Sequence, residues 1–402
     1  MSGTALLVGS SFSAIPLFFA LKRRGLRVEV CGNLPGDPCH QYADASHAID
    51  YSDREALLAV ARGGRFDYLV PSCNDYAYLA STWVAAQLGF PGFDPVDMAM
   101  MMHTKHRFRA FAEAAGVRVP ASLRLAPGGL PELGRLRAPY LVKPVDSFSG
   151  RGVTRVERAA DLAAAIDRAR AASRDATVVI ENFVPGRLHS HSAFIAGQRV
   201  VADFFVDEFC TVYPYQVDCS NHPSALVDGL RGRVRAEIER LAAAAGLADG
   251  LVHTQFIADG DDFWIVECMR RCPGDLYNRL IEISTGVPYT DLYVRPFVGE
   301  ALTPEPACTT PRFIGRHTIS RAAECVALSW SHRLGETPLD IVPLKLSGER
   351  LSAAPFDKLA IFFAEFSSAK CLHETVPRFA DLVTRSCPGT WCKKRQQKRS
   401  AG

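Results

Sequence analysis

The stretch Lys143-Pro-Val-Asp-Ser-Phe-Ser-Gly-Arg-Gly-Val153 indicates a phosphate-binding loop. A predicted strand at 141–143 delivers the lysine, and a loop rich in Ser, Gly and Arg then returns to a second strand. Lysine supplies a point charge for phosphate, and small residues let backbone N–H groups approach phosphate oxygens. The order of residues differs from the G-x-x-x-x-G-K-[ST] phosphate loop. Taken alone, the stretch is equally consistent with an exposed hairpin.

The sequence upstream predicts an open α/β unit. Strand-like residues 5–9 and 27–31 flank a helix predicted at 14–24, which is a β-α-β opening. The turn between them lacks G-x-G-x-x-G, and the second strand ends at a cysteine without an acid for a ribose hydroxyl, so a dinucleotide site is disfavoured. A serine-rich turn at a helix N-terminus can still hold an anion, which makes Ser10 and Ser11 candidate ligand residues.

A further strand is predicted at 68–71, followed by Ser72-Cys-Asn-Asp75. Open α/β sheets bind ligands at the carboxyl ends of their strands. We therefore predict that Asn74 and Asp75 hold an amine or a hydroxylated substrate. The simpler alternative is that Asp75 caps the following helix.

Two downstream segments suggest nucleotide and metal binding. Residues 178–186 form an apolar strand that runs into an acid and a Pro-Gly turn, after which exposed backbone can pair with the edge of a planar base. Gln255 and Glu267 lie on two strands separated by a predicted hairpin turn, and facing oxygen ligands suit Mg²⁺. The alternative is that Glu267 is a buried acid paired with Arg270 or Arg271.

Composition sets broad limits on the whole chain. Its 402 residues predict two to four domains, which we place at 1–95, 96–300 and 301–390 with a disordered basic tail at 391–402. The net charge is +3, but the five basic residues of 393–399 account for the excess, so the body gives no indication of nucleic-acid binding. Twelve cysteines without a CxxC motif, no signal-peptide pattern and no apolar run of about 18 residues predict a cytoplasmic protein that does not span a membrane.

These motifs, in this order, resemble the ATP-grasp superfamily of carboxylate–amine ligases, which is related to carbamoyl-phosphate synthetase and biotin carboxylase. The resemblance covers roughly residues 5–300. It implies an α/β and α+β fold: a Rossmann-like domain that precedes the ATP-grasp domain with its central and nucleotide-binding subdomains, and then a small C-terminal α+β module. Three positions depart from the family pattern: Gln255 replaces a common Glu, Met269 replaces an Asn, and Leu188 replaces the acid that binds ribose. His189 or His191 are possible substitutes for that acid.

The resemblance assigns roles residue by residue. Lys105 and Lys143 touch the nucleotide phosphates, the loop at 147–152 closes over them, the segment 181–184 receives adenine, and Arg271 lies near the transferred phosphoryl group. The residues with predicted roles are, for catalysis, Lys143, Arg151 and Arg271; for nucleotide binding, Lys105, Lys143, Ser147, Ser149, Gly150, Gly152, Glu181, Asn182, Phe183, Val184 and His189; for the metal, Gln255 and Glu267; and for substrate, Ser10, Ser11, Asn74 and Asp75.

The resemblance also implies the reaction. A small-molecule carboxylate is phosphorylated by Mg²⁺-ATP to an acyl phosphate, and an amine then displaces phosphate to leave an amide and ADP. One alternative within the superfamily is a bicarbonate-using carboxylase of the carboxyaminoimidazole ribonucleotide synthetase type. Another alternative, motivated by Met269 and Leu188, is a nucleotide-binding module without turnover. The expected partners are small molecules and, by the family's habit, a second copy of the chain, with neither nucleic acid nor membrane.

Overall fold

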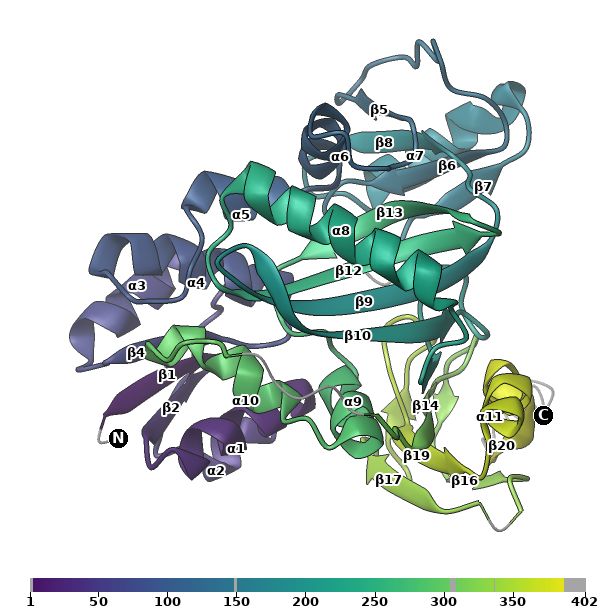
Figure 1. Ribbon diagram of the computed structural model, residues 1–402. Helices are drawn as coiled ribbons and strands as arrows, with labels where there is room; N and C mark the ends of the chain where they lie inside the picture. Colours follow the sequence, from purple (N-terminus) through teal and green to yellow (C-terminus); the bar gives the residue numbers. More distant parts are fainter. Residues whose placement is uncertain (1–2, 148–149, 304–308, 336, 387–402) are drawn as a thin grey trace, which may run out of the picture.

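Figure 1 shows the chain as a computed structural model, which describes residues 3–147, 150–303, 309–335 and 337–386. Ser149 and the predicted tail at 391–402 lie outside these residues. The expected mixture of helices and strands is confirmed. Among the described helices, none combines the length and the apolar character that a membrane span requires. Nine cysteines in the described part of the chain are free thiols.

The N-terminal part forms the predicted α/β unit around a parallel sheet. Its strand order is β3-β2-β1-β4, so the carboxyl ends of β1 and β4 lie side by side. The strands are β1 (Thr4–Val8), β2 (Arg27–Cys31), β3 (Ala45–His47) and β4 (Tyr68–Pro71), and the helices are α1 (Ile15–Arg23), α2 (Cys39–Tyr42), α3 (Arg54–Gly63) and α4 (Asp75–Leu88). Asn74 caps α4, because its Oδ1 accepts from the backbone N–H of Tyr76 at 2.8 Å. The carboxylate of Asp75 is therefore available for other contacts.

The next segment corrects one prediction. The apolar spacing of 98–115 predicts a single helix, but the structure has α5 (Val96–His103) and α6 (Lys105–Ala114). Thr104 separates them with an extended backbone (φ −104°, ψ 111°). This break places Lys105 at the first position of a new helix, and its side chain reaches towards the loop after residue 143.

A second sheet, antiparallel throughout, carries the predicted phosphate loop. Its order is β5-β8-β6-β7, and α7 (Leu162–Ala171) packs against it around a core of aliphatic residues. The strands are β5 (Ser122–Leu125), β6 (Tyr140–Pro144), β7 (Thr154–Val156) and β8 (Val178–Asn182). The loop lies between β6 and β7, as the sequence predicts.

The third sheet has eight antiparallel strands in the order β13-β12-β9-β10-β11-β14-β19-β17. They are β9 (Arg187–Ala196), β10 (Arg199–Phe209), β11 (Cys219–His222), β12 (Gly250–Asp259), β13 (Asp262–Met269), β14 (Phe313–Ile319), β17 (Leu339–Pro343) and β19 (Ala360–Phe366). The long helix α8 (Asp228–Ala245) lies across one face of the sheet (Figure 1). The opposite face packs against α9 (Tyr277–Thr285) and α10 (Tyr289–Val294), so one sheet separates two cores.

Strand β14 joins this sheet to the C-terminal elements, because it pairs with β11 on one side and β19 on the other. The remaining elements are β15 (Cys325–Val326), β16 (Ser329–His332), β18 (Arg350–Leu351), β20 (Val383–Ser386), α11 (Ala369–Thr375) and α12 (Phe379–Leu382). The domain boundaries at 95 and 300 stay predictions.

A fully buried ion pair ties the N-terminal unit to the large sheet. Arg270, just after β13, donates from Nε to Asp94 Oδ2 at 2.7 Å, and its other nitrogens donate to the carbonyls of Leu251 (2.7 Å) and Ala248 (2.6 Å). Asp94 also accepts from the hydroxyl of Tyr78 on α4 at 3.0 Å. Both charges are thus satisfied without water, which is the condition for burying them.

Replacing Asp94 by Asn should leave the Arg270 guanidinium buried without a counter-ion. We expect the free energy of unfolding, measured by urea denaturation, to fall by about 3 to 5 kcal/mol. The matched control is Glu113→Gln, which breaks an exposed pair with Arg135 and should cost at most about 1 kcal/mol. Equal losses in the two variants would contradict this account.

Candidate functional site

The predicted phosphate lysine Lys143 lies in a buried ionic cluster. Its Nζ pairs with Glu181 Oε1 from β8, while Arg109 of α6 donates to Glu181 Oε2 at 3.1 Å. Burial raises the pKa of Glu181, but Arg109 and Lys143 outweigh it and the pKa is lowered. Burial lowers the pKa of Lys143, and Glu181 only partly offsets this effect. The side chain of Glu181 is therefore fully committed to the two cations.

Lys105 approaches the same region from the start of α6. Its Nζ donates to the backbone carbonyl of Ser147 at 2.6 Å and lies 3.9 Å from Glu267 Oε1. Its positive charge also contributes, after burial, to the lowered pKa of Lys143. Two lysines that are 38 positions apart in the sequence thus flank the predicted phosphate loop.

The described residues of the loop make contacts within the loop and with distant segments. The hydroxyl of Ser147 donates to the carbonyl of Arg151 at 2.8 Å. Gly150 has φ +71°, and a Cβ there would lie 2.7 Å from the carbonyl oxygen of Pro214, so the position requires glycine. The Arg151 guanidinium lies 5.7 Å from the ring centroid of Phe356. Gly152 also has a positive φ.

The segment predicted to receive adenine follows β8. The backbone N–H groups of Asn182 and Phe183 donate to the carbonyls of Ala121 (3.0 Å) and Pro139 (2.9 Å). The guanidinium of Arg155 stacks on the ring of Phe183, 4.0 Å from its centroid. Since two backbone donors are used within the protein, the arrangement favours Val184 for recognising a base.

The two predicted metal ligands face one another. Gln255 and Glu267 are partners across β12 and β13, so their side chains share a face of the sheet. The amide Nε2 of Gln255 donates to Glu208 Oε2 at 2.6 Å, which leaves its Oε1 for another partner. The alternative of a buried Glu267 is wrong: the side chain is 34 % exposed, and within the described residues its ion pair is with Lys105.

Glu208 belongs to a polar row that runs across the large sheet. On β12 and β9, Gln255 lies opposite Ser190. On β10, β11 and β14, Glu208 lies opposite Ser220, and Ser220 lies opposite Arg316. Directly opposed residues share a face, and the hydrogen bond from Gln255 to Glu208 joins the two halves of the row, which therefore leads from the metal ligands to Arg316. Burial raises the pKa of Glu208 against the opposing effects of Ser190, Arg316 and Gln255.

Arg316 is the site residue that sequence reasoning missed. It is buried, and it donates to Ser220 Oγ at 2.7 Å and to the backbone carbonyl of Asp275 at 2.8 Å. Its Nε has no hydrogen-bond partner. Among the described residues no carboxylate lies within ion-pair distance of it, although its charge helps to lower the pKa of Asp275, which pairs directly with Lys358. A buried guanidinium that is held by neutral acceptors and has one unpartnered nitrogen can take a further, anionic partner.

Just after the C-terminal end of β13, Arg271 binds Asp75 in a two-pronged pair, with Nε–Oδ1 at 3.1 Å and Nη2–Oδ2 at 2.9 Å. His103 completes the group. Its Nε2 accepts from the backbone N–H of Arg270 at 3.1 Å, so the neutral ring carries its proton on Nδ1 and donates it to Asp75 Oδ1 at 2.8 Å. The alternative that Asp75 caps α4 is wrong, because Asn74 does so.

The remaining predicted residues are dispersed. The Ser10 hydroxyl is buried and donates to Asp37 Oδ2 at 2.6 Å, whereas Ser11 is exposed. His189 points to the α8 face, opposite Ser190, where its ring is buried and bonds to Asp207 at 2.9 Å. We therefore leave His189 out of the nucleotide site.

Two cavities lie away from these residues. One, of about 490 Å³, is lined by residues from 279 to 312, and the other, of about 560 Å³, lies between β10 and α8. Neither is lined by the lysines or the metal ligands. The polar row and the charged cluster, rather than these hollows, define the candidate site.

Comparisons with known proteins agree with this geometry. A family model described as an ATP-grasp domain matches residues 136–276. A formate-dependent phosphoribosylglycinamide formyltransferase from Rhodococcus jostii is 27 % identical over 76 % of this chain and 77 % of its own length.

Solved structures share the fold over nearly the whole chain. An L-amino acid ligase from Bacillus licheniformis superposes with a TM-score of 0.78 at 16 % identity, covering 96 % of this chain and 98 % of its own. A biotin carboxylase domain of 2-oxoglutarate carboxylase from Hydrogenobacter thermophilus, solved with MgADP, ADP and bicarbonate, has a TM-score of 0.76 at 15 % identity and covers 96 % and 91 %.

The pair between Arg271 and Asp75 makes a prediction about pH. Burial raises the pKa of Asp75, but the effects of Arg271 and His103 are larger and hold the pKa below its ordinary value. The ionised carboxylate therefore stabilises the fold above about pH 3.9, and this stabilisation is lost as the pH falls towards the lowered pKa. We expect Asp75→Asn to lose about 1 to 3 kcal/mol of unfolding free energy equally at pH 7 and pH 5.

The measurement is urea denaturation of both proteins across this range. The difference from wild type should shrink only below about pH 3.9. If it disappeared between pH 7 and pH 6, the ionised carboxylate of Asp75 would not be what stabilises the cluster.

Proposed function

We propose that the chain, whose residues 136–276 match the model of the ATP-grasp domain, is an ATP-dependent ligase that activates a small carboxylate as an acyl phosphate and joins it to an amine. One observation carries the proposal. Lys105, Lys143 and the metal ligands meet at one end of a polar row, and the other end is the buried Arg316, whose Nε has no hydrogen-bond partner. A polyphosphate and a second anion thus have separate positions on the same face of the sheet.

The residues present fit ATP and Mg²⁺. Glu267 and the free Oε1 of Gln255 are oxygen donors of the kind that Mg²⁺ prefers, and the ion takes its other ligands from water and phosphate. The buried thioether of Met269 is a poor ligand for this hard cation, so two protein oxygens are the proposed set. When bound, Mg²⁺ neutralises charge on the transferring phosphoryl group.

The chain's own residues then position and shield the reaction. A carboxylate oxygen attacks the γ-phosphorus and the bond to ADP breaks, so that an acyl phosphate forms. Lys105 and Lys143 stabilise the negative charge on the phosphoryl oxygens. The loop at 147–152 excludes water, which would otherwise hydrolyse the acyl phosphate. The amine nitrogen attacks the acyl carbon, phosphate leaves, and the amine proton passes to solvent.

The buried guanidinium of Arg316 favours a substrate that carries a negative charge. The name of the Rhodococcus jostii relative couples formate with phosphoribosylglycinamide, a small carboxylate with an amine-bearing phosphate compound. A buried guanidinium suits either the carboxylate or the phosphate of such molecules. Bicarbonate is the second candidate, because the Hydrogenobacter thermophilus structure contains it. A homodimer and a cytoplasmic location stay predictions from the sequence.

The direct test is to incubate the protein with Mg²⁺-ATP and to follow ADP and phosphate. ADP release that requires both a carboxylate and an amine from a pool of amino acids and formate supports the ligase. Release that requires bicarbonate and no amine would favour the carboxylase. ATP binding without release under any of these mixtures would leave only a nucleotide-binding module.

Lys143→Ala should slow turnover by a factor of about 10² to 10³, since a preorganised charge on the transition state is worth about 2.7 to 4 kcal/mol. The Glu181 carboxylate keeps Arg109, so the fold should survive. The control is Lys22→Ala, which removes a lysine paired with Asp44 far from the loop. Turnover by Lys143→Ala at the wild-type rate would exclude Lys143 from the phosphate site.

Arg316→Gln should raise the KM for the anionic substrate by a factor of about 10 to 100, because a charge-assisted hydrogen bond contributes about 1.5 to 3 kcal/mol. The KM for ATP should not change. Arg312→Gln is the control, since it removes an exposed arginine of the same segment that pairs with Glu365. An increase in the KM for ATP alone would place Arg316 at the nucleotide.

A further inference from the structure

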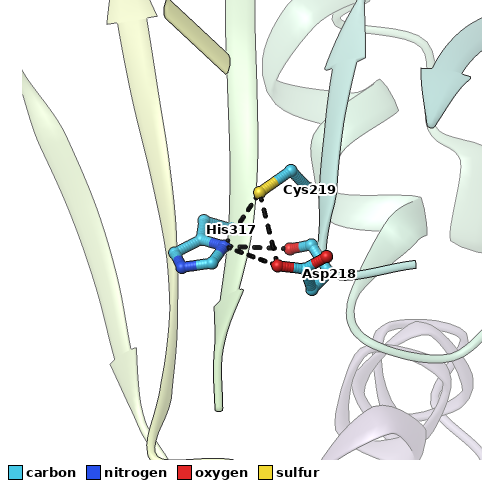
Figure 2. Close-up of side chains that lie close together, drawn as sticks. All are labelled: Asp218, Cys219 and His317. Carbon is cyan, nitrogen blue, oxygen red and sulfur yellow. Dashed lines mark hydrogen bonds and ion pairs between the residues drawn. The ribbon is translucent and has the colours of Figure 1, made fainter. Parts of the chain in front are cut away.

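A second polar cluster lies on the opposite face of β11 and β14 (Figure 2). Cys219 and His317 are partners across these strands, and Asp218 directly precedes Cys219. The neighbouring pair Ser220 and Arg316 points to the candidate site, so Cys219 and His317 point away from it. The side chains of the triad are almost fully buried, with exposed fractions of 2 %, 0 % and 0 % in chain order.

The donor atoms of the triad converge on one point. Cys219 Sγ lies 3.0 Å from His317 Nδ1 and 3.7 Å from Asp218 Oδ2, and Asp218 Oδ2 lies 3.8 Å from the same Nδ1 (Figure 2). In a tetrahedral zinc site with bonds of about 2.0 to 2.3 Å, neighbouring donor atoms lie about 3.3 to 3.6 Å apart. Shifts of a few tenths of an ångström would therefore make these three atoms one face of such a site.

The charge balance of the triad also points to a cation. Asp218 accepts hydrogen bonds from the backbone N–H and the hydroxyl of Thr211, both at 2.5 Å. Within the part of the chain that the structure describes, its ion pair is with His317 at 3.8 Å, and no lysine or arginine approaches it. A buried carboxylate is costly without a positive charge close to it.

We propose that Asp218, Cys219 and His317 form a binding site for Zn²⁺, distinct from the magnesium site of the catalytic face. A thiolate with an imidazole and a carboxylate is a donor set that suits Zn²⁺, whereas Mg²⁺ prefers oxygen ligands alone. On binding, Cys219 gives its thiol proton to solvent, so the two negative ligands neutralise the ion.

The residues around the triad place it close to the surface and indicate what a bound metal would do. Thr211 is exposed, and its hydroxyl lies 3.9 Å from Cys219 Sγ, so one residue separates the thiol from the surface. A metal held there would join β11 to β14 at the pair next to Ser220 and Arg316. The site would thus fix the strand register that positions Arg316.

The test uses the full chain after treatment with a chelator, titrated with Co²⁺ as a spectroscopic substitute for Zn²⁺. We expect one equivalent of Co²⁺ to produce a thiolate-to-metal charge-transfer band that one equivalent of Zn²⁺ abolishes. The oxygen ligands of the magnesium site cannot produce this band, so it reports on a thiolate ligand, and the variants below test whether that thiolate is Cys219. Cys219→Ser should remove the band, and Asp218→Asn, which is close in shape and keeps the thiol, should weaken Co²⁺ binding at least tenfold.

The control is Cys31→Ala, which removes a buried thiol of the N-terminal sheet and should leave the band unchanged. Circular dichroism verifies that each variant is folded. Absence of the band in folded wild type, or its persistence in Cys219→Ser, would overturn the proposal. The result does not depend on ATP turnover.

Discussion

The buried pair between Arg270 and Asp94 is the constraint on which the arrangement of the site depends. Arg270 follows β13 directly, and Asp94 lies in the connection between α4 and α5. Because both charges are buried, they must stay together, and this fixes the end of β13 against the N-terminal unit. The next residue, Arg271, reaches Asp75 at the carboxyl edge of the parallel sheet, so two consecutive arginines align the two sheets.

The large sheet then separates two functions by the alternation of side chains along its strands. One face carries the row from Glu267 to Arg316, with proposed metal and anion positions at its ends. The other face holds His189 and its partner Asp207 beneath α8, and the triad around Cys219. Adjacent residues such as Ser220 and Cys219 therefore serve different sites, since a strand turns successive side chains to opposite faces.

Local patterns predicted much of this structure. The strands at 27–31 and 68–71 match their predicted bounds, because apolar runs and flanking turn residues mark short buried strands clearly. Sequence patterns alone could not predict the contacts between distant segments. Arg316 became a site residue only through the pairing of β14 with β11, and β11 itself is a four-residue polar strand that no periodicity marks. The extended Thr104 likewise interrupted an apolar pattern that predicts one continuous helix.

The central claim is that the two ends of the polar row serve one reaction, in which a carboxylate receives the γ-phosphoryl group of ATP. Its most direct test is to supply a carboxylate substrate labelled with ¹⁸O and to analyse the released phosphate by mass spectrometry. An acyl phosphate transfers one labelled oxygen to phosphate, so the account predicts one ¹⁸O in each phosphate released with an amide. Amide formation with unlabelled phosphate would contradict it.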